Sequence, residues 1–196
     1  MLPRRRLFAA VAIIAAVALA GPTPAGADGP ANNVTVVNQS DGRAATSART
    51  ALMQDRAPAV GAENVALARA SCTECRTVAV AVEVVAVEGS VTDFHPLNAA
   101  VAVNDACTRC ETYAYARQEA IAVDGEFSPS AVGRDEIRRL SDAIDRLAAS
   151  DEPFLQMGAE LDGLVVQLLD AVRQEIERSG LHEQGRSTRR DQDMRT

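Results

Sequence analysis

The sequence contains no lysine and no tryptophan, and its only two histidines are His95 and His182. Aromatic residues make up 3% of the chain, too few to line an aromatic ligand pocket. A histidine-dependent catalytic group would have to use His95, and the surrounding "FHPLN" segment does not suggest a base. The "HEQGR" segment has Arg186 where a His-Glu-x-x-His metal site needs its second histidine. These absences favour a protein that is not an enzyme, without catalytic residues.

Long apolar runs are also scarce. The only one, residues 7–20, follows three arginines and precedes the small residues Ala25, Gly26 and Ala27. This pattern predicts a signal peptide over residues 1–27, and "RRLFA" also fits a twin-arginine export signal. No cysteine lies near the cleavage site, which argues against a lipid anchor. We therefore expect a secreted protein with no membrane span after signal removal.

Positive charge is in short supply too. The formal net charge is −7, and removal of the three signal-peptide arginines takes it to −10. A chain of this charge is not expected to bind nucleic acid or an anionic membrane surface. The mature length suits one domain, or a small domain with an appendage.

What the sequence does have is an internal repeat. When "CTECRTVAVAVE" is aligned with "CTRCETYAYARQ", Cys72 matches Cys107 and Cys75 matches Cys110. A weaker copy lies upstream, where Asp41 and its neighbours replace the Cys-x-x-Cys. Three units of roughly 33 to 35 residues thus cover residues 31–125, and each reads as strand, tight turn, strand.

Side-chain size differs between the two faces of these strands. On one face, the repeats keep matching residues: Thr77, Ala79, Ala81 and Glu83 align with Thr112, Ala114, Ala116 and Gln118. On the other face, valines are replaced by Tyr113, Tyr115 and Arg117. We expect the small face to pack closely against another layer. The predicted fold class is α+β, with an antiparallel β-sheet built from three β-hairpin repeats over residues 28–125.

The spacing of apolar residues along the chain changes after Gly125. Apolar residues at helical spacing predict two amphipathic helices within residues 126–180, the second capped by Ser150 or Asp151 and ended by Gly180. Their apolar stripes predict a helical hairpin. The polar residues 181–196 are predicted to be a disordered tail.

The four cysteines, Cys72, Cys75, Cys107 and Cys110, are the most specific feature. We favour a disulfide within each turn, since an exported protein meets an oxidising environment. Three alternatives stay open: disulfides between the two turns, a four-thiolate zinc site, and a thiol redox centre. Disulfides require no cofactor, whereas a four-thiolate site would have zinc as its cofactor.

The two repeats resemble those of actinobacterial secreted proteins of uncharacterised function, in which Cys-x-x-Cys-x-Thr-x-Ala-x-Ala-x-Gln recurs. Similar segments occur in proteins labelled peptide zinc metalloproteases. The chain departs from that pattern at Glu83, where glutamine is commoner, and it carries no protease motif. The resemblance implies that the protein acts together with a peptide-handling system.

From these observations we expect a secreted, non-catalytic structural or interaction module with turns pinned by cysteines. A protein partner would bind the C-terminal helices or a sheet edge. The alternatives are an accessory protein of a membrane peptidase or peptide-export system, suggested by the resemblance, and an extracytoplasmic thiol-disulfide protein.

Overall fold

The computed structural model describes residues 29–56 and 59–196, so the predicted signal peptide lies outside the described residues. The elements in chain order are β1 (Ala31–Asn38), β2 (Ala44–Arg56), β3 (Ala59–Val60), β4 (Glu63–Ala70), β5 (Arg76–Glu88), β6 (Asp93–Phe94), β7 (Leu97–Asn104), β8 (Glu111–Val123), α1 (Ala131–Ala148), α2 (Phe154–Arg178) and β9 (Glu183–Arg195). No helix among these residues is long and apolar enough to cross a membrane.

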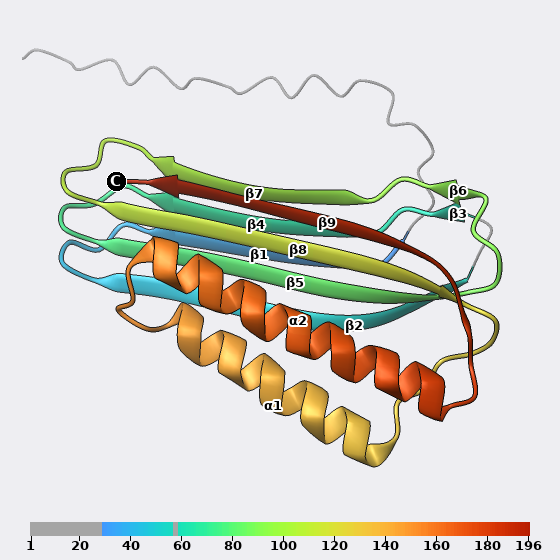
Figure 1. Cartoon of the computed structure of the whole chain (residues 1–196). Helices are drawn as coiled ribbons and strands as arrows, with labels where there is room; N and C mark the ends of the chain where they lie inside the picture. The colour runs from blue at the N-terminus through green and yellow to red at the C-terminus, as the bar shows by residue number, and fades with distance from the viewer. Residues whose placement is uncertain (1–28, 57–58) are drawn as a thin grey trace, which may run out of the picture.

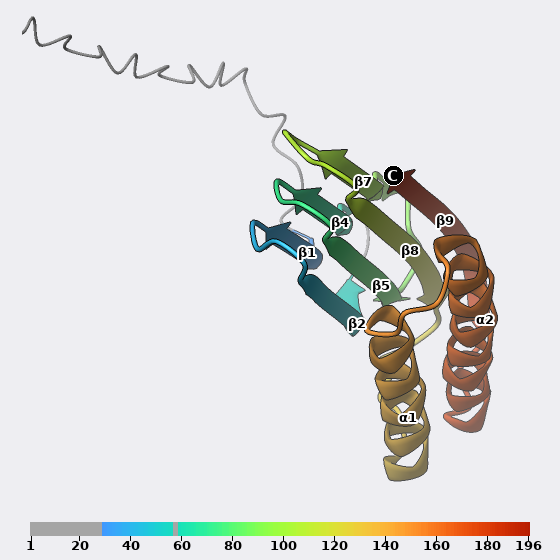
Figure 2. The same cartoon turned by 90° about the vertical axis from the view of Figure 1, so that its left-hand side faces the viewer.

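The strands form two stacked sheets, and a layer of two helices covers one of them (Figures 1 and 2). One sheet has the order β1-β4-β7 and is parallel throughout. The other has the order β2-β5-β8-β9, in which only β9 runs antiparallel to its neighbour. Strands β3 and β6 form a separate short parallel pair.

The prediction of an antiparallel sheet of β-hairpins is wrong. The two strands of each repeat lie in different sheets, so the chain forms an arch, and each strand pairs in parallel with its counterpart in the next repeat. An alternating strand, tight turn and alternating strand are compatible with both arrangements. The stack of arches is favoured because it places equivalent side chains in contact, for example Thr77 opposite Thr112 and Ala79 opposite Ala114.

The predicted close packing of the small face is confirmed, because this face fills the space between the two sheets. Its buried core consists of valine and alanine: Val34, Val36, Ala66, Ala68, Ala79, Ala81, Ala100, Ala102, Ala114 and Ala116. Side chains this small let the sheets approach closely. They also leave little room for any larger residue.

A row of asparagines crosses this interior. Asn32 donates to Asn64 Oδ1 at 2.9 Å, and Asn64 donates to Asn98 Oδ1 at 2.7 Å. The same amide groups reach the opposite sheet, since Asn64 also donates to the carbonyl oxygen of Ala81 at 3.1 Å. This Asn ladder satisfies polar groups inside a dry interface and fixes the register of one arch on the next.

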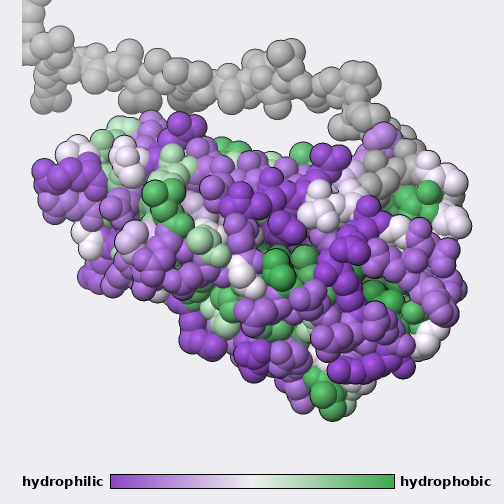
Figure 3. Space-filling view, in the orientation of Figure 1, coloured by the Kyte–Doolittle hydropathy of each residue, from purple (hydrophilic) through white to green (hydrophobic). Residues whose placement is uncertain are grey.

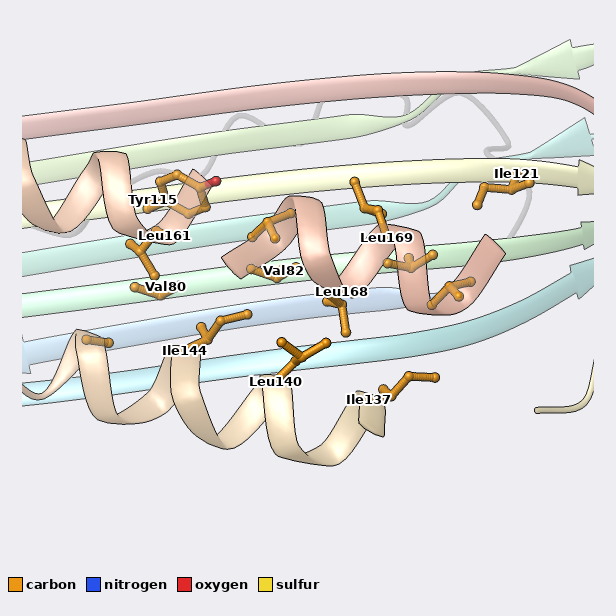
Figure 4. Close-up of a cluster of buried hydrophobic side chains, with 14 of the residues drawn as sticks. Val80, Val82, Tyr115, Ile121, Ile137, Leu140, Ile144, Leu161, Leu168 and Leu169 are labelled. Atoms are coloured by element: carbon orange, nitrogen blue, oxygen red, sulfur yellow. The ribbon is translucent and has the colours of Figure 1, made fainter. Parts of the chain in front are cut away.

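Helices α1 and α2 pack together on the outer face of β2, β5 and β8, within the region predicted to be helical. Their apolar stripes meet the valines and tyrosines of the strands: Figure 4 shows Ile137, Leu140 and Ile144 of α1 and Leu161, Leu168 and Leu169 of α2 facing Val80, Val82, Tyr115 and Ile121. The stripes are therefore buried within the molecule.

The ends of the helices differ in part from the prediction. Ser130 caps α1 by accepting a hydrogen bond from Gly133 N–H at 3.0 Å. Helix α2 begins after Pro153 without a side-chain cap, so the predicted capping by Ser150 or Asp151 is wrong. Ser150 instead donates its hydroxyl to Leu147 C=O at 2.7 Å at the end of α1.

The predicted disordered tail is also wrong, because residues 183–195 form β9 on the outer edge of β8. Two aspartates of β9 reach across to the other sheet. Asp191 accepts from Ala100 N–H at 2.8 Å, and Asp193 accepts from Ala102 N–H at 3.0 Å. One polar strand thus covers the edges of both sheets at the C-terminal end of the stack.

Candidate functional site: four cysteines at the stacked turns

The cysteines lie in the turns that join β4 to β5 and β7 to β8. Parallel stacking lays one turn on the other: Glu74 N–H bonds to Thr108 C=O at 2.8 Å, and Thr108 N–H bonds to Cys72 C=O at 3.2 Å. Glu74 and Arg109, the third residues of the two motifs, have φ values of 52° and 54°. This left-handed conformation is uncommon for non-glycine residues, and here it closes both turns in the same way.

Within each turn, the two cysteines lie at disulfide distance. The Cα atoms of Cys72 and Cys75 are 6.1 Å apart, and those of Cys107 and Cys110 are 5.9 Å apart. Both separations fall in the range that a disulfide spans without backbone movement.

The two pairs also touch each other. Cys75 Sγ lies 3.4 Å from Cys110 Sγ, and all four sulfur atoms lie within 4.8 Å of one another. Cys72, Cys75 and Cys110 are 5%, 2% and 3% exposed, whereas Cys107 is only partly buried. The structure therefore bonds Cys72 to Cys75 and Cys107 to Cys110, while the sulfur atoms of different turns are in contact without being bonded. The clustering of all four sulfur atoms is also compatible with a four-thiolate zinc site.

The groups that surround the sulfur atoms disfavour thiolates. Cys72 C=O lies 2.9 Å from Cys110 Sγ, and Asn38 C=O lies 3.3 Å from Cys72 Sγ. Carbonyl oxygens carry partial negative charge and disfavour the thiolate form that binds zinc or acts as a nucleophile. The backbone N–H groups of Glu74 and Thr108, which are the kind of group that stabilises a thiolate, bond instead to carbonyl oxygens of the neighbouring turn.

A second polar group is buried between the sheets, near the other end of the strands. Gln118 donates to Glu83 at 2.7 Å, and the Glu83 side chain is fully buried. Burial raises the pKa of Glu83 to about 7, although the hydrogen bond from Gln118 opposes this change. The repeat alignment matched these two residues as equivalent positions, but nothing in the sequence indicated how deeply they are buried.

The histidine segment near the C-terminus is at the surface. His182 Nδ1 lies 3.0 Å from a carboxylate oxygen of Asp124, and the His182 side chain is 78% exposed. Hydrogen bonds from His182, chiefly from its backbone N–H, lower the pKa of Asp124. This arrangement joins the end of β8 to the start of β9.

Sequence reasoning missed two features of the stack. They are the Asn ladder, which crosses all three arches, and the aspartates of β9, which lie at the C-terminal end. A signal for the ladder was present, since Asn32, Asn64 and Asn98 hold the second position of β1, β4 and β7. The aspartates carried no such signal, because their partners are backbone groups of a distant strand.

The fold and the site define a stack of three β-arches, with paired cysteines at two of the three turns and a helical layer on one side. Comparison with protein-family models, curated proteins and solved structures finds no match.

Proposed function

We propose that the protein is a secreted, non-catalytic structural and interaction module that binds a protein partner at the outer edge of β1. The observation that carries this proposal is the difference between the two ends of the arch stack. The apolar stripes of the helices are buried, so a sheet edge is the better of the two predicted contact surfaces.

The C-terminal end of the stack is closed. Strand β9 occupies the outer edge of β8, and its Asp191 and Asp193 bond to the backbone of β7. The β1 strand of a second copy of this chain would therefore find the outward N–H groups of Ala100 and Ala102 on β7 already bonded. The same contacts oppose head-to-tail addition of β1 to β7.

The N-terminal end is open over the part of the chain that the structure describes, where β1 pairs with β4 alone. Ser71 N–H bonds to Asn38 C=O at 2.9 Å, which directs the even-numbered residues of β1 towards β4. Alternate residues of a parallel strand direct their backbone groups to opposite sides, so odd-numbered residues such as Thr35 face outward. Unlike β2, which carries exposed Arg49 and Arg56, β1 has no charged residue to protect this edge.

The Asn ladder indicates what would fit there. Its first member, Asn32, is fully buried, and its Oδ1 atom has no hydrogen-bond partner among the described residues. Within the ladder, the Oδ1 atoms of Asn64 and Asn98 each accept from the asparagine of the preceding arch. The partner we propose is an arch of the same Asn-x-Ala-x-Ala type from a different chain, whose asparagine donates to Asn32.

A peptide with the β7 sequence, LNAAVAVN, is a suitable probe for this partner. We expect the fluorescently labelled peptide to bind the mature protein in an anisotropy titration. A peptide with alanine in place of its first asparagine should bind about fivefold more weakly, the value of one hydrogen bond of about 1 kcal/mol.

The variant Thr35→Pro removes an outward N–H and should abolish binding, because proline is tolerated on an edge strand but cannot donate to a new neighbour. Thr35→Ser is the matched control and should bind like the unmodified protein. Absence of peptide binding, or equal binding by Thr35→Pro, would show that β1 is not the contact surface.

Secretion is tested separately. The N-terminal pattern and the cysteine pairs at disulfide distance support it. We expect the protein in the culture medium of an expressing bacterium to begin at Asp28 when its mass is measured. A protein retained inside the cells with residues 1–27 intact would contradict this part of the proposal.

A further inference from the structure

We propose that the two cysteine pairs form one thiol-disulfide exchange site, in which Cys107 reacts with an external thiol and Cys110 passes the exchange to Cys75. The exchange is stoichiometric, one external thiol for each protein molecule, so it is compatible with a non-catalytic module. It goes beyond the proposed binding function and does not depend on it. It follows from the contact between the two pairs and from the unequal exposure of their sulfur atoms.

The arch stack brings the two pairs together. The register that sets Arg76 opposite Glu111 continues into the turns, where Thr73 bridges to Thr108. As a result, Cys75 Sγ and Cys110 Sγ approach to 3.4 Å, although 35 residues separate them. Two disulfides in a hairpin sheet would have no reason to be in such contact, whereas a parallel stack of equal turns requires it.

Exposure decides where an external thiol can enter. Cys72, Cys75 and Cys110 are buried, and Cys107 is the partly exposed member of the cluster. Attack by an external thiolate on Cys107 Sγ forms a mixed disulfide there and breaks the Cys107–Cys110 bond. The electron pair of that bond leaves on Cys110 as a thiolate.

The second step transfers the exchange between the turns. The Cys110 thiolate lies beside Cys72 C=O, which disfavours its charge, and it is in contact with Cys75 Sγ. Its attack forms a Cys75–Cys110 bond, breaks the Cys72–Cys75 bond and leaves Cys72 as a thiolate. Cys72 then takes a proton from solvent, and its S–H can donate to Asn38 C=O, 3.3 Å away.

The overall reaction conserves the number of disulfides. One external thiol is bound at Cys107, one thiol appears at Cys72, and a cross-turn bridge replaces the two local ones. Because the bridge joins neighbouring arches, the exchange also changes how the stack is tied together. The chemical class of the reactant is a small thiol or a cysteine-containing peptide.

Reduced glutathione is the probe for the test, applied to the mature, oxidised protein. After brief exposure, the reaction is quenched with acid, free thiols are alkylated, and the protein is cut with trypsin. Cleavage at arginine places Cys72 and Cys75 in residues 70–76, Cys107 in residues 77–109 and Cys110 in residues 110–117. Mass spectrometry identifies the linked peptides, and fragmentation of residues 70–76 shows which of Cys72 and Cys75 carries the bridge and which carries the alkyl group.

We expect glutathione on Cys107, the alkyl group on Cys72, and a new link between residues 70–76 and 110–117. Alkylation at Cys110, with the Cys72–Cys75 bridge intact, would overturn the proposal, because it would mean that the two pairs react independently. Four free thiols around a zinc ion in the untreated protein would overturn it as well.

Two single variants form a matched pair. In Cys107→Ser, the freed Cys110 should attack Cys75, so the Cys75–Cys110 link forms without any added thiol. In Cys72→Ser, the freed Cys75 should attack Cys110 and release the partly exposed Cys107, which should then be alkylated in the native protein. Retention of the free thiol on Cys110 in the first variant, or on Cys75 in the second, would contradict the exchange.

Discussion

Strand β5 separates two interiors that are built differently. Its face towards the other sheet carries alanines, which lie opposite the strands that hold the Asn ladder. Its face towards the helices carries valines that meet leucines, isoleucines and tyrosines. The first interior is narrow and repeats from arch to arch. The second is thicker and differs from strand to strand, because helices can adjust to side chains of several sizes. The two interiors should therefore respond differently to the same substitution.

The largest effect is expected from Ala81→Leu, which adds three carbons on the sheet-facing side where Ala81 is fully buried. We expect a loss of about 3 kcal/mol or more in the free energy of unfolding. The same change at Ala86, on the helix-facing side of β5, should cost less, because Ala86 borders a hollow lined by Gln54, Val123 and Phe127. Urea denaturation measures both, and an equal loss would mean that the interiors do not differ in this way.

Removal of side-chain volume should destabilise the helix-facing interior more than the sheet-facing one. Leu161 is fully buried between α2 and the sheet, and Leu161→Ala should lower the free energy of unfolding by about 3 kcal/mol. On the sheet-facing side, Ala81→Gly removes a single methyl group and should cost about 1 kcal/mol. A Leu161→Ala protein as stable as the unmodified one would show that the helices are not part of the main core.

Glu83 gives the narrow interior a dependence on pH. Its folded-state pKa of about 7 lies above the ordinary glutamate pKa of 4.5, so the protonated form favours folding. Its contribution is complete below pH 4.5 and is lost as pH rises through 7. Between pH 5 and 8 we expect a loss of about 2 kcal/mol from this group.

The matched variant is Glu83→Gln, which keeps the size and hydrogen-bonding capacity of the side chain but does not ionise. Its free energy of unfolding should stay nearly constant between pH 5 and 8. Thermal or urea unfolding at several pH values makes the comparison. A decline as steep as that of the unmodified protein would assign the pH dependence to another group.

The smallest effect is expected at the closed end of the stack. Asp193→Ala removes the acceptor for Ala102 N–H and should cost about 1 kcal/mol. Asp135→Ala, which removes an exposed ion pair within α1, is the control and should cost about 0.3 kcal/mol. Hydrogen exchange at Ala102 should also become faster in Asp193→Ala alone; unchanged exchange would mean that Asp193 does not protect this edge.

Much of this architecture could be predicted from local patterns. The repeat, the turns, the small face and the two helices each follow from residues close together in sequence. The stacking direction could not, because alternation of side chains is the same in a hairpin and in an arch. Evidence for the arch was present in the matching of Thr77 with Thr112 and of Glu83 with Gln118, which a parallel register brings into contact.

The tail and the cysteine cluster were harder to predict for related reasons. Strand β9 is polar because it lies at the surface, and its pairing with β8 depends on an edge that exists only after the arches have stacked. Likewise, the contact between Cys75 and Cys110 follows from the stacking of turns and not from the spacing within either motif. Long-range pairing determined both outcomes.

The most direct test of the arch stack is a set of nuclear Overhauser contacts between backbone protons of the isotopically labelled mature protein. Parallel stacking predicts contacts between β5 and β8, with Val80 near Tyr115, and between β4 and β7, with Ala66 near Ala100. Contacts across each turn, with β4 protons paired to β5 protons in antiparallel order, would restore the hairpin sheet and contradict both the open end at β1 and the cysteine exchange site.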